Sequence, residues 1–269
     1  MLKVKEIQIK GILTRSKLPE SEYCLNPYVG CSHACVYCYS RFMRRFTGHS
    51  NDKWGTFVDV KINASEVLRK ELSKNPKIGV ALLGSVTDAY QPLERKYKIT
   101  RSIIEVLSEY RFPFSILTKS DLVLRDLDIL KKLDNLDVGL TITTMNDNVR
   151  RHFEPHSSSV ESRVRALKEL HENGISTYVF IGPILPRLTE IRPIVSTVKN
   201  FVNSVWAETL NVKCGNWNDI ETVLRNHFPH LTSNYKKIVL DQHYWDQVGE
   251  ELKKTCQEFN IPLTGYYTH

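Results

Sequence analysis

Short apolar runs alternate with amphipathic segments through the middle of the chain, from about residue 78 to residue 213. The runs have the length and β-branched content of buried strands, which are predicted at Ile78–Leu83, Phe114–Thr118, Val138–Thr144, Ser176–Ile181 and near Glu208–Lys213. Apolar residues at helical spacing predict helices at Thr100–Tyr110, after Ser120, after Ser158 and near Ile191–Ser204. Strands that alternate with helices in this way indicate βαβ units and a parallel sheet.

Serine residues mark the starts of two of these helices. Ser120 is a predicted N-cap, and Ser158 with Glu161 forms a Ser-x-x-Glu capping box. The helix behind the capping box directs one apolar row inward, made of Val160, Val164, Leu167 and Leu170. We therefore expect Arg163 and Arg165 to lie on the exposed side of that helix.

The number of predicted units limits the architecture. With one further strand before Cys31, the chain contains about six βα units, which is fewer than the eight of a closed (β/α) barrel. The predicted fold is therefore an α/β, incomplete (β/α)6 TIM-type barrel that is open along one side. We expect residues 1–213 to form this barrel and residues 214–269 to form a C-terminal helical extension packed on the same domain, ending in a strand at Ile261–Tyr267.

Composition excludes several classes of protein. The chain is 41% hydrophobic and 10% aromatic, so it can bury a core without disulfide bonds. Its first residues lack the apolar segment of a signal peptide, and no apolar run is long enough to span a membrane. We expect a cytoplasmic protein with no membrane partner. The net charge of +7 favours phosphate-rich partners. Arg41, Arg44 and Arg45 are either a solvated helix face or a nucleic-acid contact.

Three of the six cysteines lie close together, at Cys31, Cys35 and Cys38. A C-x3-C-x2-C spacing can hold three corners of a cubane iron–sulfur cluster as thiolates and leaves the fourth iron without a protein ligand. An open iron can chelate a small molecule, which a four-cysteine electron-transfer site cannot do. Two alternatives remain open. Zinc could take the same three thiolates with Cys24 or His33, and a ferredoxin-like cluster could recruit Cys214 or Cys256.

The cysteine spacing resembles that of the radical S-adenosylmethionine superfamily, including the aromatic Tyr37 before the last cysteine. Within it, the chain resembles the spore photoproduct lyase-related branch, often labelled DNA repair photolyase. The blocks that carry this resemblance are Asn26–Tyr39, Ser85–Asp88 with Tyr90–Glu94, Leu117–Asp121 and Phe153–Pro155. They span about residues 24 to 190.

The resemblance implies a [4Fe–4S] cluster on the three cysteines and S-adenosylmethionine on the open iron, reduced by an external electron donor of the ferredoxin or flavodoxin type. It implies cofactor contacts from the hydroxyl of Thr87, from Lys119 to the methionyl carboxylate, from Thr141 or Thr143 to the ribose, and from Tyr37, Tyr39 and Gly182 around the adenosyl group. In a parallel barrel, such residues belong at the carboxyl ends of strands. Asp88 is expected to cap the turn that follows it.

One departure from the branch concerns its chemistry. Spore photoproduct lyases carry a cysteine whose thiol returns a hydrogen atom to the product, and this chain has Ser85 at the matching place. The resemblance therefore implies a radical enzyme that acts on nucleic acid without that thiol. An enzyme that modifies a peptide, a protein or a small molecule is the second hypothesis, and a non-catalytic, zinc-bound nucleic-acid-binding module is the third.

Overall fold

The main sheet has eight strands in the order β11-β10-β9-β8-β7-β6-β3-β2, in a computed structural model that describes residues 1–269. Their bounds are Thr14–Arg15 (β2), Tyr23–Leu25 (β3), Ala81–Leu83 (β6), Phe114–Thr118 (β7), Leu136–Thr141 (β8), Ser176–Ile184 (β9), Ser204–Thr209 (β10) and Leu263–Tyr267 (β11). Every neighbouring pair from β3 to β11 is parallel, and β2 alone runs antiparallel to its neighbour. Because β2 and β11 are unpaired edges, the predicted incomplete barrel is confirmed.

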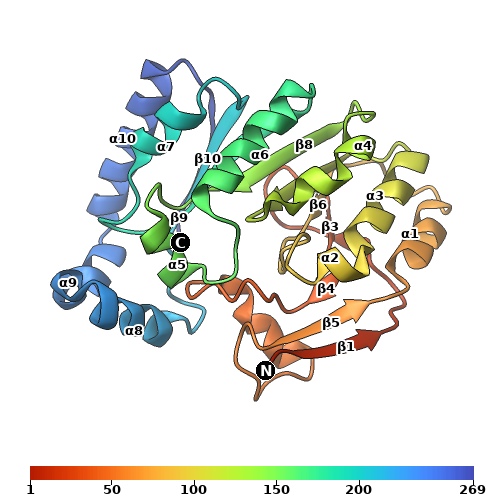
Figure 1. Ribbon diagram of the computed structural model, residues 1–269, viewed down its shortest axis with the longest axis horizontal. Coiled ribbons are helices and arrows are strands. Elements are labelled where there is room, and N and C mark those ends of the chain that lie inside the picture. The colour runs from red at the N-terminus through yellow and green to blue at the C-terminus, as the bar shows by residue number, and fades with distance from the viewer.

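Helices lie around this sheet, and those that connect its strands cover its outer face (Figure 1). They are α1 (Ala64–Leu72), α2 (Glu94–Tyr97), α3 (Ile99–Glu109), α4 (Leu127–Leu130), α5 (Asp147–Phe153), α6 (Val160–Glu172), α7 (Ile191–Val198), α8 (Trp217–His227), α9 (Pro229–Val239) and α10 (Gln242–Glu258), with 3-10 helices η1 (Tyr39–Phe46) and η2 (Asp121–Asp126). The last three helices wrap one side of the barrel, where α10 packs on α7 and α8 packs on α5. None of the helices is both long and apolar enough to cross a membrane.

A second, smaller sheet lies beside the barrel in the order β1-β5-β4. It contains β1 (Lys3–Ile7), β4 (Tyr28–Val29) and β5 (Phe57–Lys61). Strand β5 is buried at its first four residues, whereas β1 is exposed along most of its length. Because β4 leads directly into the cysteine segment, this sheet anchors the start of that segment.

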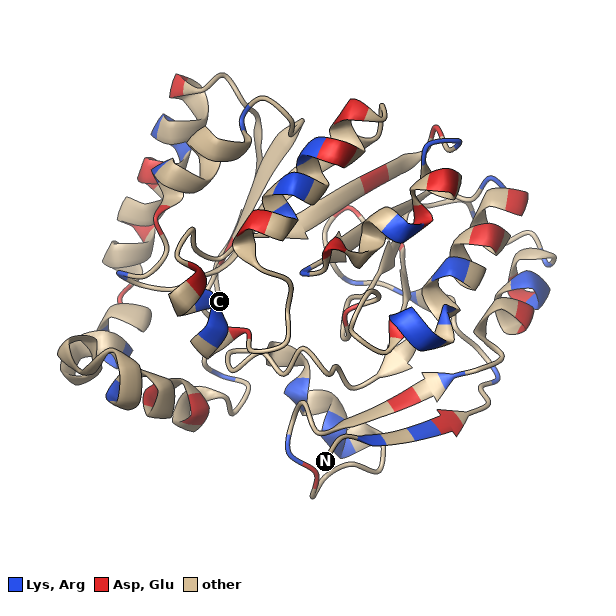
Figure 2. Cartoon of the chain, viewed as in Figure 1, with Lys and Arg blue, Asp and Glu red and all other residues tan.

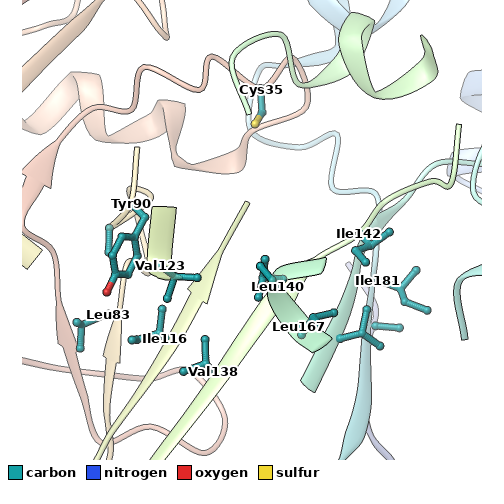
Figure 3. Packing of buried hydrophobic residues seen from close by; sticks show 14 of the residues in the cluster. Cys35, Leu83, Tyr90, Ile116, Val123, Val138, Leu140, Ile142, Leu167 and Ile181 are labelled. Atoms are coloured by element: carbon teal, nitrogen blue, oxygen red, sulfur yellow. The ribbon is translucent and has the colours of Figure 1, made fainter. Parts of the chain in front are cut away.

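The barrel strands divide their side chains between two faces. In β7, Phe114, Ile116 and Thr118 are buried, and the intervening Ser115 and Leu117 line the interior cavity described below. Figure 3 shows the outer face, where Ile116, Val138 and Leu140 of neighbouring strands meet Val123 of η2 and Leu167 of α6. One face of each strand therefore lines the cavity, and the other face packs against the helices.

Several predicted boundaries are wrong. The strand predicted near Glu208–Lys213 lies at Ser204–Thr209 in the structure, and the helix predicted to reach Ser204 ends at Val198. Residues 204–209 alternate between positions that face the cavity and positions buried against the helices. Both faces of a strand are therefore packed here, and the strand forms at these residues rather than at the apolar residues that follow.

The predicted capping box is displaced by one residue. Ser159 is the N-cap of α6, and its hydroxyl accepts a hydrogen bond from the backbone of Ser162. Ser158 instead donates to Asp121 at 2.6 Å, which ties the loop before α6 to the start of η2. Glu161 is exposed. Ser120 does cap a helix, as predicted, although that helix is η2.

The segment after residue 213 supplies α8, α9 and α10 and then the edge strand of the main sheet. Strand β11 runs parallel to β10, with Tyr267 beside Glu208. The end of the chain therefore meets the carboxyl ends of the barrel strands.

Candidate functional site

A cavity of about 740 Å³ lies inside the barrel, and residues from both ends of the strands line it, such as Lys119 after β7 and Ser204 at the start of β10. Its walls include all three clustered cysteines and six of the seven predicted cofactor residues, namely Tyr37, Tyr39, Thr87, Lys119, Thr141 and Gly182. Thr143 does not line it. Deeper in the barrel, the wall is aromatic, formed by Tyr178, Phe180 and Trp206. The topology thus collects residues from six parallel strands and the cysteine segment around one space.

The cysteine segment is a turn-rich loop with little regular structure of its own. Cys31 and Cys35 are each 7% exposed, Cys38 is partly buried, and all three are free thiols. Burial and then the neighbouring Cys31 raise the pKa of the Cys38 thiol to about 11. Burial also raises the pKa of Cys35. Metal coordination offsets such a cost, because a metal-bound thiol is deprotonated.

Hydrogen bonds from the segment after β6 hold the start of this loop. The Thr87 hydroxyl donates to the carbonyl of Gly30 at 2.6 Å, and the Ser32 amide donates to the side-chain oxygen of Gln91 at 2.8 Å. Gly30 itself has a φ of +83°, and a Cβ there would lie 2.5 Å from the carbonyl oxygen of Phe57. Thr87 therefore positions the loop through the same hydroxyl for which a cofactor contact was predicted.

A buried carboxylate, Glu154, holds the middle of the loop. It accepts hydrogen bonds from the hydroxyl of Tyr37 and, at 2.8 Å, from that of Thr143, and it pairs with Arg163. Glu154 and Arg163 are both 0% exposed. Burial alone would raise the pKa of Glu154, but Arg163 and then Lys119 lower it to about 2. Glu154 is therefore ionised and fixes the aromatic residue that precedes Cys38.

The expectation that Arg163 is surface charge is wrong, whereas Arg165 is exposed as expected. The sequence does contain the signal for a buried arginine. Arg163 follows Val160 by three residues and precedes Leu167 by four, so it lies within the apolar row of α6. A charged residue in such a row needs a buried partner, and Phe153-Glu154-Pro155 was the block that contained it.

Lys119 brings a positive charge to the cavity beside the cysteines. Its ammonium nitrogen lies 5.8 Å from the centre of the Tyr37 ring. Burial lowers the pKa of Lys119, but Cys35, Glu154 and Asp88 outweigh that effect and raise it. The side chain is therefore a partly buried cation on the cavity wall, which suits an anionic ligand group.

Asp88 ties the loop to the end of β7. Its carboxylate accepts from the Tyr90 amide at 2.9 Å, which confirms the expected turn cap, and also from the Thr118 hydroxyl at 2.6 Å. It further pairs with His33 at 3.3 Å. Burial lowers the pKa of His33, but Asp88 and then Cys31 outweigh it and raise that pKa to about 9. His33 thus serves as the partner of Asp88.

Tyr39 closes the cavity on the side of η1. It is 37% exposed, and its hydroxyl donates to the backbone carbonyl of Ser85. Burial and then the Glu208 carboxylate raise the pKa of Tyr39. The Ser85 hydroxyl lies 3.0 Å from the amide nitrogen of Asn26. Ser85 lines the cavity, whereas the three cysteines outside the cluster do not.

Arg41 does not reach solvent, contrary to the expectation of an exposed arginine group. It is 7% exposed, pairs with Asp219 at 2.8 Å and donates to the carbonyl of Val36 at 2.8 Å. Arg44 donates to the carbonyl of Asp52 at 2.6 Å, and Arg45 is exposed. Arg41 therefore fastens the cysteine loop to the first turn of α8.

The donor set of the cavity fits an iron–sulfur cubane. No three His, Cys, Asp or Glu side chains converge on a single metal-ion position. Three separate thiols along one cavity wall match the separate iron corners of a cubane better than one ion. Trp54 also lines the cavity and packs with Cys31, and its buried indole N–H has no acceptor in the chain. A buried donor without a partner indicates that a further group completes this wall.

Comparison with known proteins identifies the class. Residues 25–195 match the model of the radical SAM superfamily, so the chain belongs to that superfamily and is an enzyme. An uncharacterised protein of Methanocaldococcus jannaschii is 38% identical over 268 residues, which is 100% of this chain and 98% of that protein. A radical SAM Nα-GlyT isomerase of Pseudomonas phage M6 is 26% identical over 161 residues, which is 60% of this chain and 32% of that protein.

Spore photoproduct lyase is similar in both sequence and structure. The enzyme of Clostridium acetobutylicum is 23% identical over 172 residues, covering 62% of this chain and 47% of that enzyme. A solved structure of spore photoproduct lyase with a dinucleoside spore photoproduct superimposes with a TM-score of 0.71 at 16% identity, covering 98% of this chain and 81% of that one. At this identity the superposition establishes the shared fold.

The Glu154–Arg163 pair leads to a prediction about stability. Changing Glu154 to Gln should lower the free energy of unfolding at pH 7 by about 3–5 kcal/mol, because it leaves the Arg163 charge buried and unpaired. Glu161→Gln, on the exposed side of α6, should change it by less than about 0.5 kcal/mol. Urea unfolding followed by circular dichroism measures both.

The pH dependence of the difference in unfolding free energy between wild type and Glu154→Gln distinguishes a charge effect from a packing effect. The folded-state pKa of Glu154 is about 2 against an ordinary value of 4.5. The stabilisation is therefore complete above pH 4.5 and is lost as the pH falls toward 2. The gap between wild type and Glu154→Gln should narrow over that range. A gap that stays constant would assign the effect to packing.

Proposed function

We propose that Cys31, Cys35 and Cys38 hold a [4Fe–4S] cluster and that the barrel cavity binds S-adenosylmethionine. The observation that carries this proposal is the shared wall on which the three thiols and the Lys119 ammonium lie. Membership of the radical SAM superfamily supports both cofactors. When bound, they supply a 5′-deoxyadenosyl radical, formed by one-electron cleavage of S-adenosylmethionine.

The chain's own residues bind and shield the cofactor in this proposal. Lys119 pairs with the methionyl carboxylate, and Thr141 donates to the ribose. Tyr37 and Tyr39 flank the adenosyl group, and the backbone at Gly182 approaches the adenine. A Cβ at Gly182 would fall 2.0 Å from the Phe180 ring, so this close packing requires glycine. Thr87 and Glu154 position the loop and Tyr37.

Cluster ligation is tested by removing one thiol at a time. Cys35→Ala should abolish cluster assembly or leave it labile, because three thiolates are the minimum protein set for this cubane. Cys24→Ala, Cys214→Ala and Cys256→Ala should retain iron near the wild-type content, since none of these residues lines the cavity. Iron and sulfide analysis after anaerobic reconstitution measures this. Zinc in place of iron, or iron loss in a control variant, would contradict the proposal.

Cofactor binding and cleavage are tested through Lys119. The reduced protein should convert S-adenosylmethionine to methionine and 5′-deoxyadenosine. Lys119→Met should bind S-adenosylmethionine about 10-fold or more weakly, the equivalent of about 1.5–3 kcal/mol for a charge-assisted hydrogen bond. Lys132→Met removes an exposed lysine and should have no effect. Equilibrium binding and product chromatography decide the outcome, and wild-type affinity in Lys119→Met would remove this residue from the site.

We further propose that the substrate is nucleic acid. The net charge of +7 supports a phosphate-rich partner, and the similarity to spore photoproduct lyase supports the same class. Only part of the predicted arginine group is available for phosphate contacts, because Arg41 is buried in an ion pair. We therefore expect fewer phosphate contacts from this group than three arginines would make.

Ser85 leads to a prediction about reaction outcome. The O–H bond of serine is much stronger than the S–H bond of a thiol, so Ser85 is a poor hydrogen-atom donor. Incubation with ultraviolet-irradiated DNA under reducing anaerobic conditions should give no thymine-dimer repair, or slow repair with side products. Ser85→Cys should reduce the side products if dimers are substrates, and Ser85→Ala should behave as wild type. Clean, fast repair by the wild type would contradict the role assigned to Ser85.

Substrate classes are separated by measuring DNA and RNA affinity as a function of salt. Affinity for nucleic acid should fall as salt rises, because phosphate contacts release counterions. Salt-insensitive or absent binding would favour a peptide, protein or small-molecule substrate. The formation of 5′-deoxyadenosine is measured separately, so the radical chemistry and the substrate class are tested independently.

A further inference from the structure

Three aromatic side chains lie in a row on the surface of η1. Tyr39, Phe42 and Phe46 are spaced three and four residues apart, and they are 37%, 39% and 75% exposed. The rings of Tyr39 and Phe42 are stacked at 6.5 Å, and those of Phe42 and Phe46 meet edge to face at 6.4 Å. The row leads from the cavity, which Tyr39 lines, to the surface. A contiguous exposed row of this kind is typical of an interaction site.

The same helix carries Lys or Arg positions, drawn in blue in Figure 2. Arg45 on η1 is exposed and forms no ion pair. The hydrogen bonds that Arg44 donates go to backbone carbonyls and not to a carboxylate. The nearest acidic residue along the chain, Asp52, is already paired with Lys3 and His49. The surface of η1 therefore carries uncompensated positive charge beside an apolar centre. Charge complementarity favours an acidic partner.

Helix η1 is also the continuation of the cysteine loop to the surface. Cys38 is its N-cap residue, whereas Cys31 and Cys35 are buried. An electron that enters the cavity from outside needs a surface close to the thiols. Among the elements that follow the loop, η1 begins at a thiol and ends in solvent at Phe46.

We propose that Tyr39, Phe42, Arg45 and Phe46 form the docking surface for a small acidic one-electron carrier protein, and this rests on the proposed cluster. In the encounter, the reduced carrier loses one electron and the cluster gains it, and no atom is transferred. Redox encounters of this kind use small interfaces with an apolar centre and a charged rim. A nucleic-acid track would need a row of phosphate contacts, and the burial of Arg41 leaves η1 without one.

The experiment compares two reductants on the reconstituted protein. A reduced bacterial flavodoxin must dock to deliver its electron, whereas dithionite reaches the cluster without docking. Phe46→Ser and Arg45→Glu should each slow reduction by flavodoxin about fivefold or more, and leave reduction by dithionite unchanged. The matched controls are Leu240→Ser, which replaces a residue 62% exposed just after the end of α9, and Arg165→Glu. Wild-type reduction by flavodoxin should also slow as salt rises.

A second readout does not depend on the cluster. The affinity of oxidised flavodoxin for the cluster-free chain should fall in the two η1 variants and not in the controls. Equal flavodoxin rates in the variants and the controls would overturn the proposal. If dithionite reduction slows as well, the affinity measurement decides, and unchanged affinity overturns the proposal. A loss of single-stranded oligonucleotide affinity with unchanged flavodoxin affinity would make η1 a nucleic-acid surface instead.

Failure of the proposed function gives a different result. A wild-type protein that dithionite cannot reduce lacks the proposed cluster, whatever η1 binds. A cluster that dithionite reduces in every variant, together with flavodoxin rates that η1 does not affect, leaves the cluster in place and removes the docking surface.

Discussion

The buried ion pair of Glu154 and Arg163 is the interaction on which the site depends. Glu154 receives the hydroxyls of Tyr37 and Thr143, and Arg163 also donates to the carbonyl of Thr141 at 2.9 Å. The pair therefore joins the cysteine loop, the end of β8 and the start of α6. Two charges in a dry interior are tolerated only with such complete hydrogen bonding. The same hydrogen bonds hold the cysteine loop against the barrel.

A loop with little regular structure must satisfy its polar groups elsewhere. The cysteine loop does so through distant segments that hold it from three sides. Gln91 and Thr87 hold its start, Phe153 and Glu154 hold its middle, and Asn216 donates to the carbonyl of Tyr37 at 2.7 Å. The thiols are thereby presented to the cavity from a fixed backbone. Binding sites built in this way lose little entropy when a ligand arrives.

The charges around the cavity are arranged in two layers. Lys119, Asp88 and His33 lie at the wall, where Asp88 pairs with His33, and Glu154 and Arg163 lie behind it and pair with each other. Lys119 thus remains the cation offered to a ligand. The strand alternation that forms this wall also separates it from the core, because cavity-facing and core-facing residues occupy alternate positions of each strand.

Local pattern determined the strands, the helices, the open barrel and the cysteine motif, because periodicity and spacing reside in neighbouring residues. The alternation of Phe114–Thr118 and the spacing of Cys31, Cys35 and Cys38 are examples. Tertiary structure decided which polar residues are buried. Arg163 is buried because it pairs with Glu154, which lies nine residues earlier in the chain and also holds the cysteine loop. Arg41 is buried because it pairs with Asp219, which is distant from it in the sequence. The apolar row of α6 indicates that Arg163 is buried, but a buried charge needs a partner, and a local pattern does not identify a partner that folding brings from another segment.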